Sequence, residues 1–245
     1  MLYKRFIPKV LVSWDSTVHR FNTVLTTEYR VSRKIGDPLS HLSVLQSNLV
    51  DEIMLINLSQ SRMKEFTKLV DEIGRFLSTP LSVGGFISKE EDCSRLIAAG
   101  ADRLILGRNR WQKELSTFIN REFGRQAVAC SLDYLEGDLN NLIDSADQII
   151  RKVEDFGYGE ILLNCTSRDG ARIGPDLKLL ETFAKASLLP IVVGCGIGSV
   201  QHITDAFLGG ASGVASGTFL SNLDQSPKQI RAHLFSNGVH IRHRN

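Results

Sequence analysis

Apolar residues gather in eight short runs along the chain, and a longer segment with helical spacing follows each run. The runs lie near residues 6–13, 51–57, 80–84, 102–107, 126–133, 159–165, 189–194 and 212–216. Helical spacing is found near residues 38–48, 61–78, 88–99, 109–123, 142–157, 176–187, 199–209 and 226–236. Continuous apolar runs are typical of parallel strands that are buried on both faces. The pattern therefore predicts an α/β protein built from eight strand–helix units.

The second half of the chain repeats motifs of the first half in the same order and at an almost constant offset. The paired segments are 81–88 with 191–198, 98–107 with 208–217, and 50–57 with 158–165. A doubly wound sheet is the alternative fold, but it gives no reason for an internal repeat of four units. We therefore predict a single (β/α)8 barrel, or TIM barrel, over residues 1–245 with an internal half-barrel repeat.

Composition narrows the class of protein further. The 245 residues carry a formal net charge of +2, with 42% hydrophobic and 23% charged residues. These values are ordinary for a globular domain and give no indication of nucleic acid or a membrane surface as a partner. The four cysteines are far apart, and no histidine pair lies near a carboxylate cluster. We therefore expect a cytoplasmic protein without disulfides, a metal site or a cofactor.

The connection between the first strand and the first helix is unusually long. It covers about residues 14–36 and shows no helical spacing. Connections of this length in compact domains are usually functional or mobile. At its end, Asp37 followed by Pro38 is a typical helix start.

Glycines follow the third, seventh and eighth predicted strands. In a barrel these turns share the active face, and exposed N–H groups at such turns can bind phosphate. The predicted phosphate-binding residues are Gly84, Gly85, Arg108, Gly170, Gly194, Gly196, Gly198, Gly217 and Thr218. For any single turn, close packing of a helix on a strand explains the glycines equally well. Two paired cradles favour a ligand with a phosphate at each end.

Segment 164–176 is the most distinctive loop, with the sequence "NCTSRDGARIGPD". A loop with a carboxylate and two glycines can close over a ligand. We expect Arg168 and Asp169 to lie over the ligand. The alternative is a well-formed turn that Asp169 caps.

Four charged residues mark the opposite end of the barrel. Arg5, Glu52, Arg103 and Glu160 stand at or near the starts of the first, second, fourth and sixth predicted strands. They should therefore converge at the mouth away from the glycine turns. Buried charges are costly unless they are paired. A structural layer of ion pairs explains such a ring without any further function.

The chain resembles the cyclase subunit of imidazole glycerol phosphate synthase over its whole length. The resemblance rests on "LYKRFIP", "IGDP", "VGGFIS", "AAGADRLI", "GEILLNCTSRDGARIG" and "LPIVVGCGI". It implies a lyase subunit of a glutamine amidotransferase that receives ammonia from a glutaminase subunit docked at the N-terminal barrel face. The four charged residues match the family's ammonia gate, and Asp102 matches a position that faces the glutaminase. The ammonia would pass through the barrel to a bisphosphate.

The chain departs from this family at the chemical face. The family uses two aspartates as acid and base; Asp133 matches the second, but Leu11 stands in place of the first. Leucine transfers no proton, so the resemblance implies impaired cyclase chemistry unless the alignment slips to Asp15. The family's aspartate at the end of the second strand is replaced by Asn57. Paralogues encoded with surface-polysaccharide (lipopolysaccharide) genes share the aliphatic residue, and they are associated with a glutaminase and a separate amidotransferase that makes acetamidino sugars.

Three functions follow from this combination. The first is a subunit that relays ammonia for the amidation of a surface-glycan sugar. The second is the working cyclase of histidine biosynthesis, which forms imidazole glycerol phosphate and AICAR. The third is a barrel that binds a sugar phosphate without catalysis. We favour the first.

Overall fold

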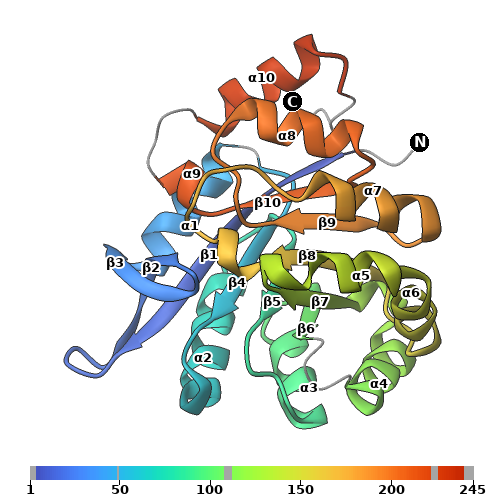
Figure 1. Cartoon of the computed structure of the whole chain (residues 1–245). Helices are drawn as coiled ribbons and strands as arrows, with labels where there is room; N and C mark the ends of the chain where they lie inside the picture. The colour runs from blue at the N-terminus through green and yellow to red at the C-terminus, as the bar shows by residue number, and fades with distance from the viewer. Residues whose placement is uncertain (1–3, 49, 108–111, 222–225, 240–245) are drawn as a thin grey trace.

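Eight parallel strands close into a barrel in the computed structural model, which describes residues 4–48, 50–107, 112–221 and 226–239 (Figure 1). The barrel strands are β1 (Arg5–Asp15), β4 (Ile53–Asn57), β5 (Leu81–Gly84), β6 (Arg103–Gly107), β7 (Val128–Tyr134), β8 (Glu160–Cys165), β9 (Ile191–Gly194) and β10 (Gly213–Ser216). Strand β1 pairs in parallel with both β4 and β10, which closes the ring. The predicted (β/α)8 barrel is confirmed.

Helices cover the outside of the barrel between successive strands. They are α1 (Pro38–Ser47), α2 (Met63–Gly74), α3 (Glu90–Ala98), α4 (Lys113–Phe123), α5 (Leu139–Asp144), α6 (Ala146–Asp155), α7 (Leu177–Ala186), α8 (Val200–Leu208), α9 (Thr218–Ser221) and α10 (Pro227–Ser236). Helix α1 starts as predicted, because the Asp37 carboxylate accepts the N–H of Ser40 at 2.8 Å. The helix predicted over 142–157 is instead two helices that meet at Ser145. Within the described ranges, every helix is too short or too polar to cross a bilayer.

The long connection after β1 is a β-hairpin rather than an irregular loop. Strand β1 runs on to Asp15, and β2 (Arg20–Thr27) and β3 (Arg30–Gly36) follow it as antiparallel strands that extend the sheet beside the barrel (Figure 1). Strand β2 is buried from Phe21 to Thr26, whereas β3 is exposed from Arg30 to Ile35. Threonine and asparagine residues interrupt the apolar residues of β2, so the sequence lacks the continuous apolar run that identifies the barrel strands.

Two apolar layers fill the molecule. The larger one lies between the strands and the helices and includes the even-numbered residues Phe6, Val10 and Val12 of β1. The smaller one fills the barrel and consists of Ile7, Met54, Ile105, Ala129, Leu162, Val192 and Ala215. Because side chains alternate along a strand, Arg5 and Lys9 point inward like Ile7. One strand thus places three chemically different side chains along the inside of the barrel.

Gly85 provides a test of the packing above β5. An added Cβ would lie 2.1 Å from the Asn57 carbonyl oxygen, and the residue has a φ of +99°. Gly85→Ala should therefore lower the free energy of unfolding by about 2 kcal/mol or more, because both the clash and the backbone conformation oppose a side chain. Denaturant unfolding measures the loss. Gly137→Ala is the matched control, because nothing lies within 4 Å of its added Cβ; equal stability of the two variants would contradict this account.

Candidate functional site

The four charged residues at the N-terminal mouth form a closed ring of ion pairs. Arg5 Nη1 lies 2.6 Å from Glu52 Oε2, and Arg5 Nη2 pairs with Glu160 Oε2. Arg103 Nη1 lies 3.1 Å from both Glu52 Oε1 and Glu160 Oε1. Each cation therefore bridges both anions. The predicted convergence of these side chains at one mouth is what the structure shows, and their role as an ammonia gate stays a prediction.

Burial sets the electrostatics of this ring. The carboxylate side chains are only 6% exposed, against 20–21% for the arginines. Burial raises the pKa of Glu160 above its ordinary value, while Arg103 and Arg5 oppose that shift. Asp102 lies beside the ring on an exposed rim, where its carboxylate accepts the Leu81 N–H at 2.8 Å. That exposed position is compatible with a partner interface, which remains a prediction for Asp102.

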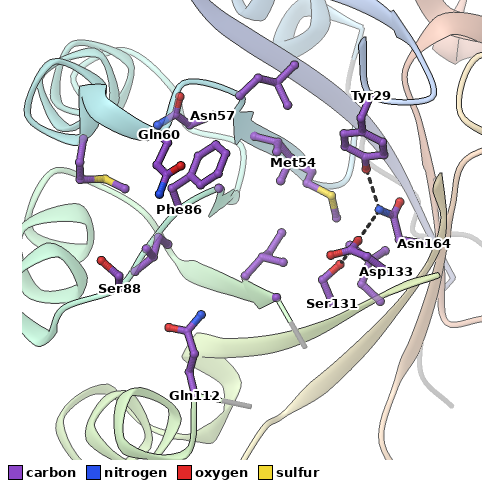
Figure 2. A pocket seen from close by; sticks show the side chains of 18 of the residues that line it. Tyr29, Met54, Asn57, Gln60, Phe86, Ser88, Gln112, Ser131, Asp133 and Asn164 are labelled. Atoms are coloured by element: carbon purple, nitrogen blue, oxygen red, sulfur yellow. Dashed lines mark hydrogen bonds between the residues drawn. The ribbon is translucent and has the colours of Figure 1, made fainter. Parts of the chain in front are cut away.

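A cavity of about 720 Å³ opens at the opposite mouth (Figure 2). Its floor includes Met54, Ile105 and Leu162, which belong to the apolar layer inside the barrel. Figure 2 shows two polar groups of side chains at different ends of this floor. One group contains Tyr29, Ser131, Asp133 and Asn164. The other contains Asn57, Gln60 and Ser88 around the apolar ring of Phe86, and Gln112 lies apart from both. Ring, apolar layer and cavity therefore follow one another through the barrel.

Asp133 lies at the first polar end, near the end of β7, as predicted from the sequence. Its Oδ1 accepts hydrogen bonds from Asn164 Nδ2 at 2.6 Å and from Ser131 Oγ at 3.0 Å. Its Oδ2 has no hydrogen-bond donor among the residues that the structure describes, and it faces Gly107. One carboxylate oxygen is thus fixed, and the other is available to take a proton from a ligand in the cavity.

Lys9 is a buried cation that the sequence reasoning missed. Its side chain is 3% exposed, and its Nζ lies 3.1 Å from Tyr29 Oη, 3.3 Å from Cys195 Sγ and 3.4 Å from Asn164 Oδ1. Burial alone would lower the pKa of Lys9, but the neighbouring Cys195, Tyr29 and Asp169 outweigh burial and raise it. The signal was present in the sequence: a lysine two residues after an inward Ile7 also faces inward.

Asp169 is a structural anchor in this conformation. It is 5% exposed, and its carboxylate accepts hydrogen bonds from Thr26 Oγ1 and, at 3.1 Å, from the N–H of Tyr29. Its carbonyl oxygen accepts the N–H of Glu28 at 3.2 Å. The tip of the β2–β3 hairpin is thereby fixed to the loop after β8. Arg168 points to another neighbour, Glu136, at 2.6 Å, and the expectation that both residues lie over a ligand stays untested.

The glycine turn after β9 is occupied by the protein's own residues, and the turn after β10 borders only small spaces. The Gly196 N–H donates to the Arg168 carbonyl at 3.0 Å, and the Gly198 N–H donates to His202 Nδ1 at 3.2 Å. The spaces that Gly217 and Thr218 line have volumes of only about 10 and 20 Å³. These spaces are of the size of a water molecule, so they do not admit a phosphate in this conformation.

The remaining predicted phosphate residues fall into three groups. Gly85 lines the large cavity, and Gly84 packs beneath it against Ile56 and Ile105. Gly194 packs against Asn164, and Gly170 packs against the hairpin at Thr26. Arg108 lies outside the described residues. Close packing therefore explains most of these glycines, and phosphate binding remains a prediction. Among the predicted phosphate-binding glycines that the structure describes, only Gly85 borders a space large enough for a phosphate.

Neither Leu11 nor Asp15 lines the large cavity, but Leu11 lines the small adjoining space together with Lys9, which borders both. Leu11 is 5% exposed and pairs in register with Val24 and Ile56. The Asp15 carboxylate lies 2.5 Å from Lys34 Nζ and accepts the Thr17 N–H at 2.9 Å. These hydrogen bonds lower the pKa of Asp15 to about 2. Asp15 therefore belongs to the hairpin and is unsuited to carry protons at neutral pH.

A barrel with its polar cavity at the carboxyl ends of the strands has the arrangement of (β/α)8-barrel enzymes. Residues 7–224 match the family described as histidine biosynthesis protein, and the chain belongs to that family. Within it, the relatives place the chain in the HisF group of imidazole glycerol phosphate synthase subunits.

Three relatives illustrate the similarity. The chain is 31% identical to the "Putative imidazole glycerol phosphate synthase subunit hisF2" of Prochlorococcus marinus (strain MIT 9313), over 99% of both chains. It is 28% identical to the subunit HisF of Hydrogenobaculum sp. (strain Y04AAS1), over 99% of this chain and 100% of the relative. It is 32% identical to the HisF of Lactococcus lactis subsp. cremoris (strain MG1363), over 84% and 83%.

The anchoring role of Asp169 leads to a stability prediction. Asp169→Asn keeps the size of the side chain but removes the charge beside Lys9, so the hairpin tip should loosen at a cost of about 1–3 kcal/mol. Hydrogen exchange should then speed up at Thr26 and Tyr29 more than in the barrel strands. Asp71→Asn, on the exposed face of α2, is the control. Unchanged exchange at the hairpin would show that Asp169 does not hold it.

Proposed function

We propose that this chain is the synthase-type subunit of a glutamine-dependent amidotransferase and conducts ammonia through its barrel. The order of ring, apolar layer and cavity inside one closed barrel carries this proposal. A glutaminase partner would dock at the end that holds Arg5, Glu52, Arg103, Glu160 and Asp102. An apolar interior suits neutral ammonia better than ammonium, because a charge is costly to bury without a partner.

The acceptor that we favour is a surface-glycan sugar, amidated together with a separate amidotransferase. Two observations support it. Leu11 stands where the family has a proton-transferring aspartate, and Asp15 is committed to the hairpin through Lys34. In addition, one similar relative carries a hisF2 name, which sets it apart from the relatives named HisF. The proposal assigns Asp133 to the chemistry of the cavity and a phosphorylated small molecule to the cavity itself.

The second candidate is the cyclase of histidine biosynthesis. It is favoured by the position of Asp133, whose free oxygen lines the cavity, and by the names of relatives that match nearly the whole chain. The two candidates differ in what they expect of Leu11. A cyclase needs a second group that replaces the aspartate, whereas an ammonia relay for another acceptor does not need the ordinary cyclase rate.

The ordinary cyclase reaction separates the two candidates. With ammonium as the nitrogen source, the unmodified chain should turn over the family's bisphosphate substrate about 100- to 10,000-fold more slowly than its Leu11→Asp variant, because general acid–base help is worth that much. Leu11→Asn is the matched control, since the amide has the same size but transfers no proton. A wild-type rate equal to that of a two-aspartate family member would establish the cyclase instead.

The ring can be tested in the complex with a glutaminase. Glu52→Gln breaks the charge balance of the ring, so it should change the glutamine-driven rate and leave the ammonium-driven rate unchanged, because free ammonium reaches the cavity from its open mouth. Glu181→Gln, on the outer face of α7, is the control. Equal effects on the glutamine-driven and ammonium-driven rates would contradict a role of the ring as an ammonia gate. If the chain binds no glutaminase, it is a sugar-phosphate-binding barrel rather than a relay.

A further inference from the structure

Tyr29 is placed beside Asp133 and Asn164 by contacts in which its hydroxyl oxygen accepts two hydrogen bonds. Its Oη accepts hydrogen bonds from Asn164 Nδ2 at 2.6 Å and from Lys9 Nζ at 3.1 Å. Both neighbours act only as donors in these contacts, so the phenolic hydrogen is directed to another acceptor, and the Cys195 sulfur, with which Tyr29 also forms a side-chain hydrogen bond, is one within reach. Tyr29 lines the cavity, and its ring reaches Asn164 from the hairpin side in Figure 2. Because sulfur is a weak hydrogen-bond acceptor, a ligand oxygen in the cavity can replace it as the acceptor of this hydrogen.

Asn164 couples this hydroxyl to the carboxylate of Asp133. The same Nδ2 donates to Tyr29 Oη and to Asp133 Oδ1, each at 2.6 Å. The two oxygens are thus no further apart than twice that distance. The orientation of the amide is fixed at its other end, where Oδ1 accepts from Cys195 Sγ at 3.1 Å and from Lys9 Nζ at 3.4 Å. A phenol and a carboxylate are held side by side at one end of the floor.

We infer that Tyr29 donates, and Asp133 accepts, the proton that must move when ammonia adds to a carbonyl carbon in the cavity. The inference rests on the proposed function, because ammonia must reach this point. The nitrogen lone pair forms the new C–N bond, and the C=O π electrons move to oxygen. Asp133 Oδ2 takes one proton from the nitrogen, and Tyr29 Oη gives one to the oxygen. The product is a carbinolamine, and solvent returns the proton from Asp133 to Tyr29.

The environment keeps the phenol protonated and places a cation beside it. Burial raises the pKa of Tyr29 well above its ordinary value, so the phenol keeps its proton at neutral pH. Lys9 opposes that shift, because its ammonium stabilises the phenolate that remains after donation. Lys9 is therefore a positioning residue that acts through Tyr29. The hairpin that carries Tyr29 continues directly from β1, the strand that has Leu11 in place of a carboxylate.

A cycle of variants tests the inference, with ammonium and the family's bisphosphate substrate as the probe. Tyr29→Phe should lower the residual kcat of the wild-type chain by about 100-fold or more and change KM little. In the Leu11→Asp background the same change should cost much less, because the carboxylate resumes the role. Tyr158→Phe is the matched control, since its hydroxyl is buried away from this cavity.

Each outcome of these measurements supports or contradicts the role of Tyr29 as a proton donor. Equal rates of wild type and Tyr29→Phe would overturn the inference, and so would a wild-type rate no faster than buffer. An equal loss in both backgrounds would show that Tyr29 is only structural. Should Leu11→Asp fail to fold, Lys9→Met gives a second readout: it should lower kcat at constant KM, and Lys9→Arg should restore part of the rate. A wild-type rate equal to that of Leu11→Asp would end the proposed relay but leave Tyr29 as the donor.

Discussion

The alternation of side chains along β1 is the constraint on which the rest of the molecule depends. In a closed barrel every second residue of a strand must face inward. Arg5, Ile7 and Lys9 therefore share the interior, although they differ in charge and polarity. Arg5 finds two carboxylates at the mouth, and Ile7 joins the apolar layer. Lys9 lies above that layer and requires polar partners there. This requirement explains why polar side chains surround it at the cavity end of the barrel.

The partners of Lys9 come from distant parts of the chain. Tyr29, Asn164, Asp169 and Cys195 all lie within 4.0 Å of its ammonium. A buried lysine without such partners would lose its proton or cost several kcal/mol. An apolar residue at this position would spare the barrel that cost, as buried ion pairs are often no better for stability than apolar packing. The structure thus retains a cation at a place where stability alone gives no reason for it.

The hairpin tip shows how local strain is offset by a tertiary contact. Glu28 and Tyr29 both have positive φ angles, 52° and 60°, and each such non-glycine residue costs on the order of 1 kcal/mol or more. A two-residue hairpin turn requires this conformation at both positions. The hydrogen bonds from Tyr29 and Glu28 to Asp169 compensate for the strain. The glycine-poor turn is therefore stable only while Asp169 holds it, and its strain fixes the position of Tyr29.

The sequence was sufficient to predict the barrel strands, but not to predict the arrangement of side chains at the cavity end of the barrel. Continuous apolar runs and the half-chain repeat identify the eight strands because both depend on local burial. Strand starts likewise place Arg5, Arg103 and Glu160 at one end. The hairpin could not be predicted in this way, because tertiary contacts bury β2 although its local sequence does not indicate burial. The contact between Tyr29 and Asp169 likewise joins residues that are 140 positions apart. The resemblance to the family identified Asp133. The space beside the glycines after β9, predicted to hold a phosphate, is instead occupied by the loop from Arg168 to Gly174.

These observations give the proposed replacement of a family carboxylate by Leu11 a physical context. If the upper mouth had only lost its chemistry, nothing would require a buried lysine, an oriented amide and a phenol around Asp133. Instead, the amide nitrogen of Asn164 donates one hydrogen bond to Tyr29 Oη, on the proposed proton donor, and one to Asp133 Oδ1, on the proposed proton acceptor. Preorganised polar groups of this kind are costly to fold and are found where charge develops during a reaction. With the proposed role of Tyr29, the proton donor lies on the hairpin that extends β1 and not on β1 itself. The molecule that accepts ammonia must then present its carbonyl oxygen to the hairpin side of the cavity.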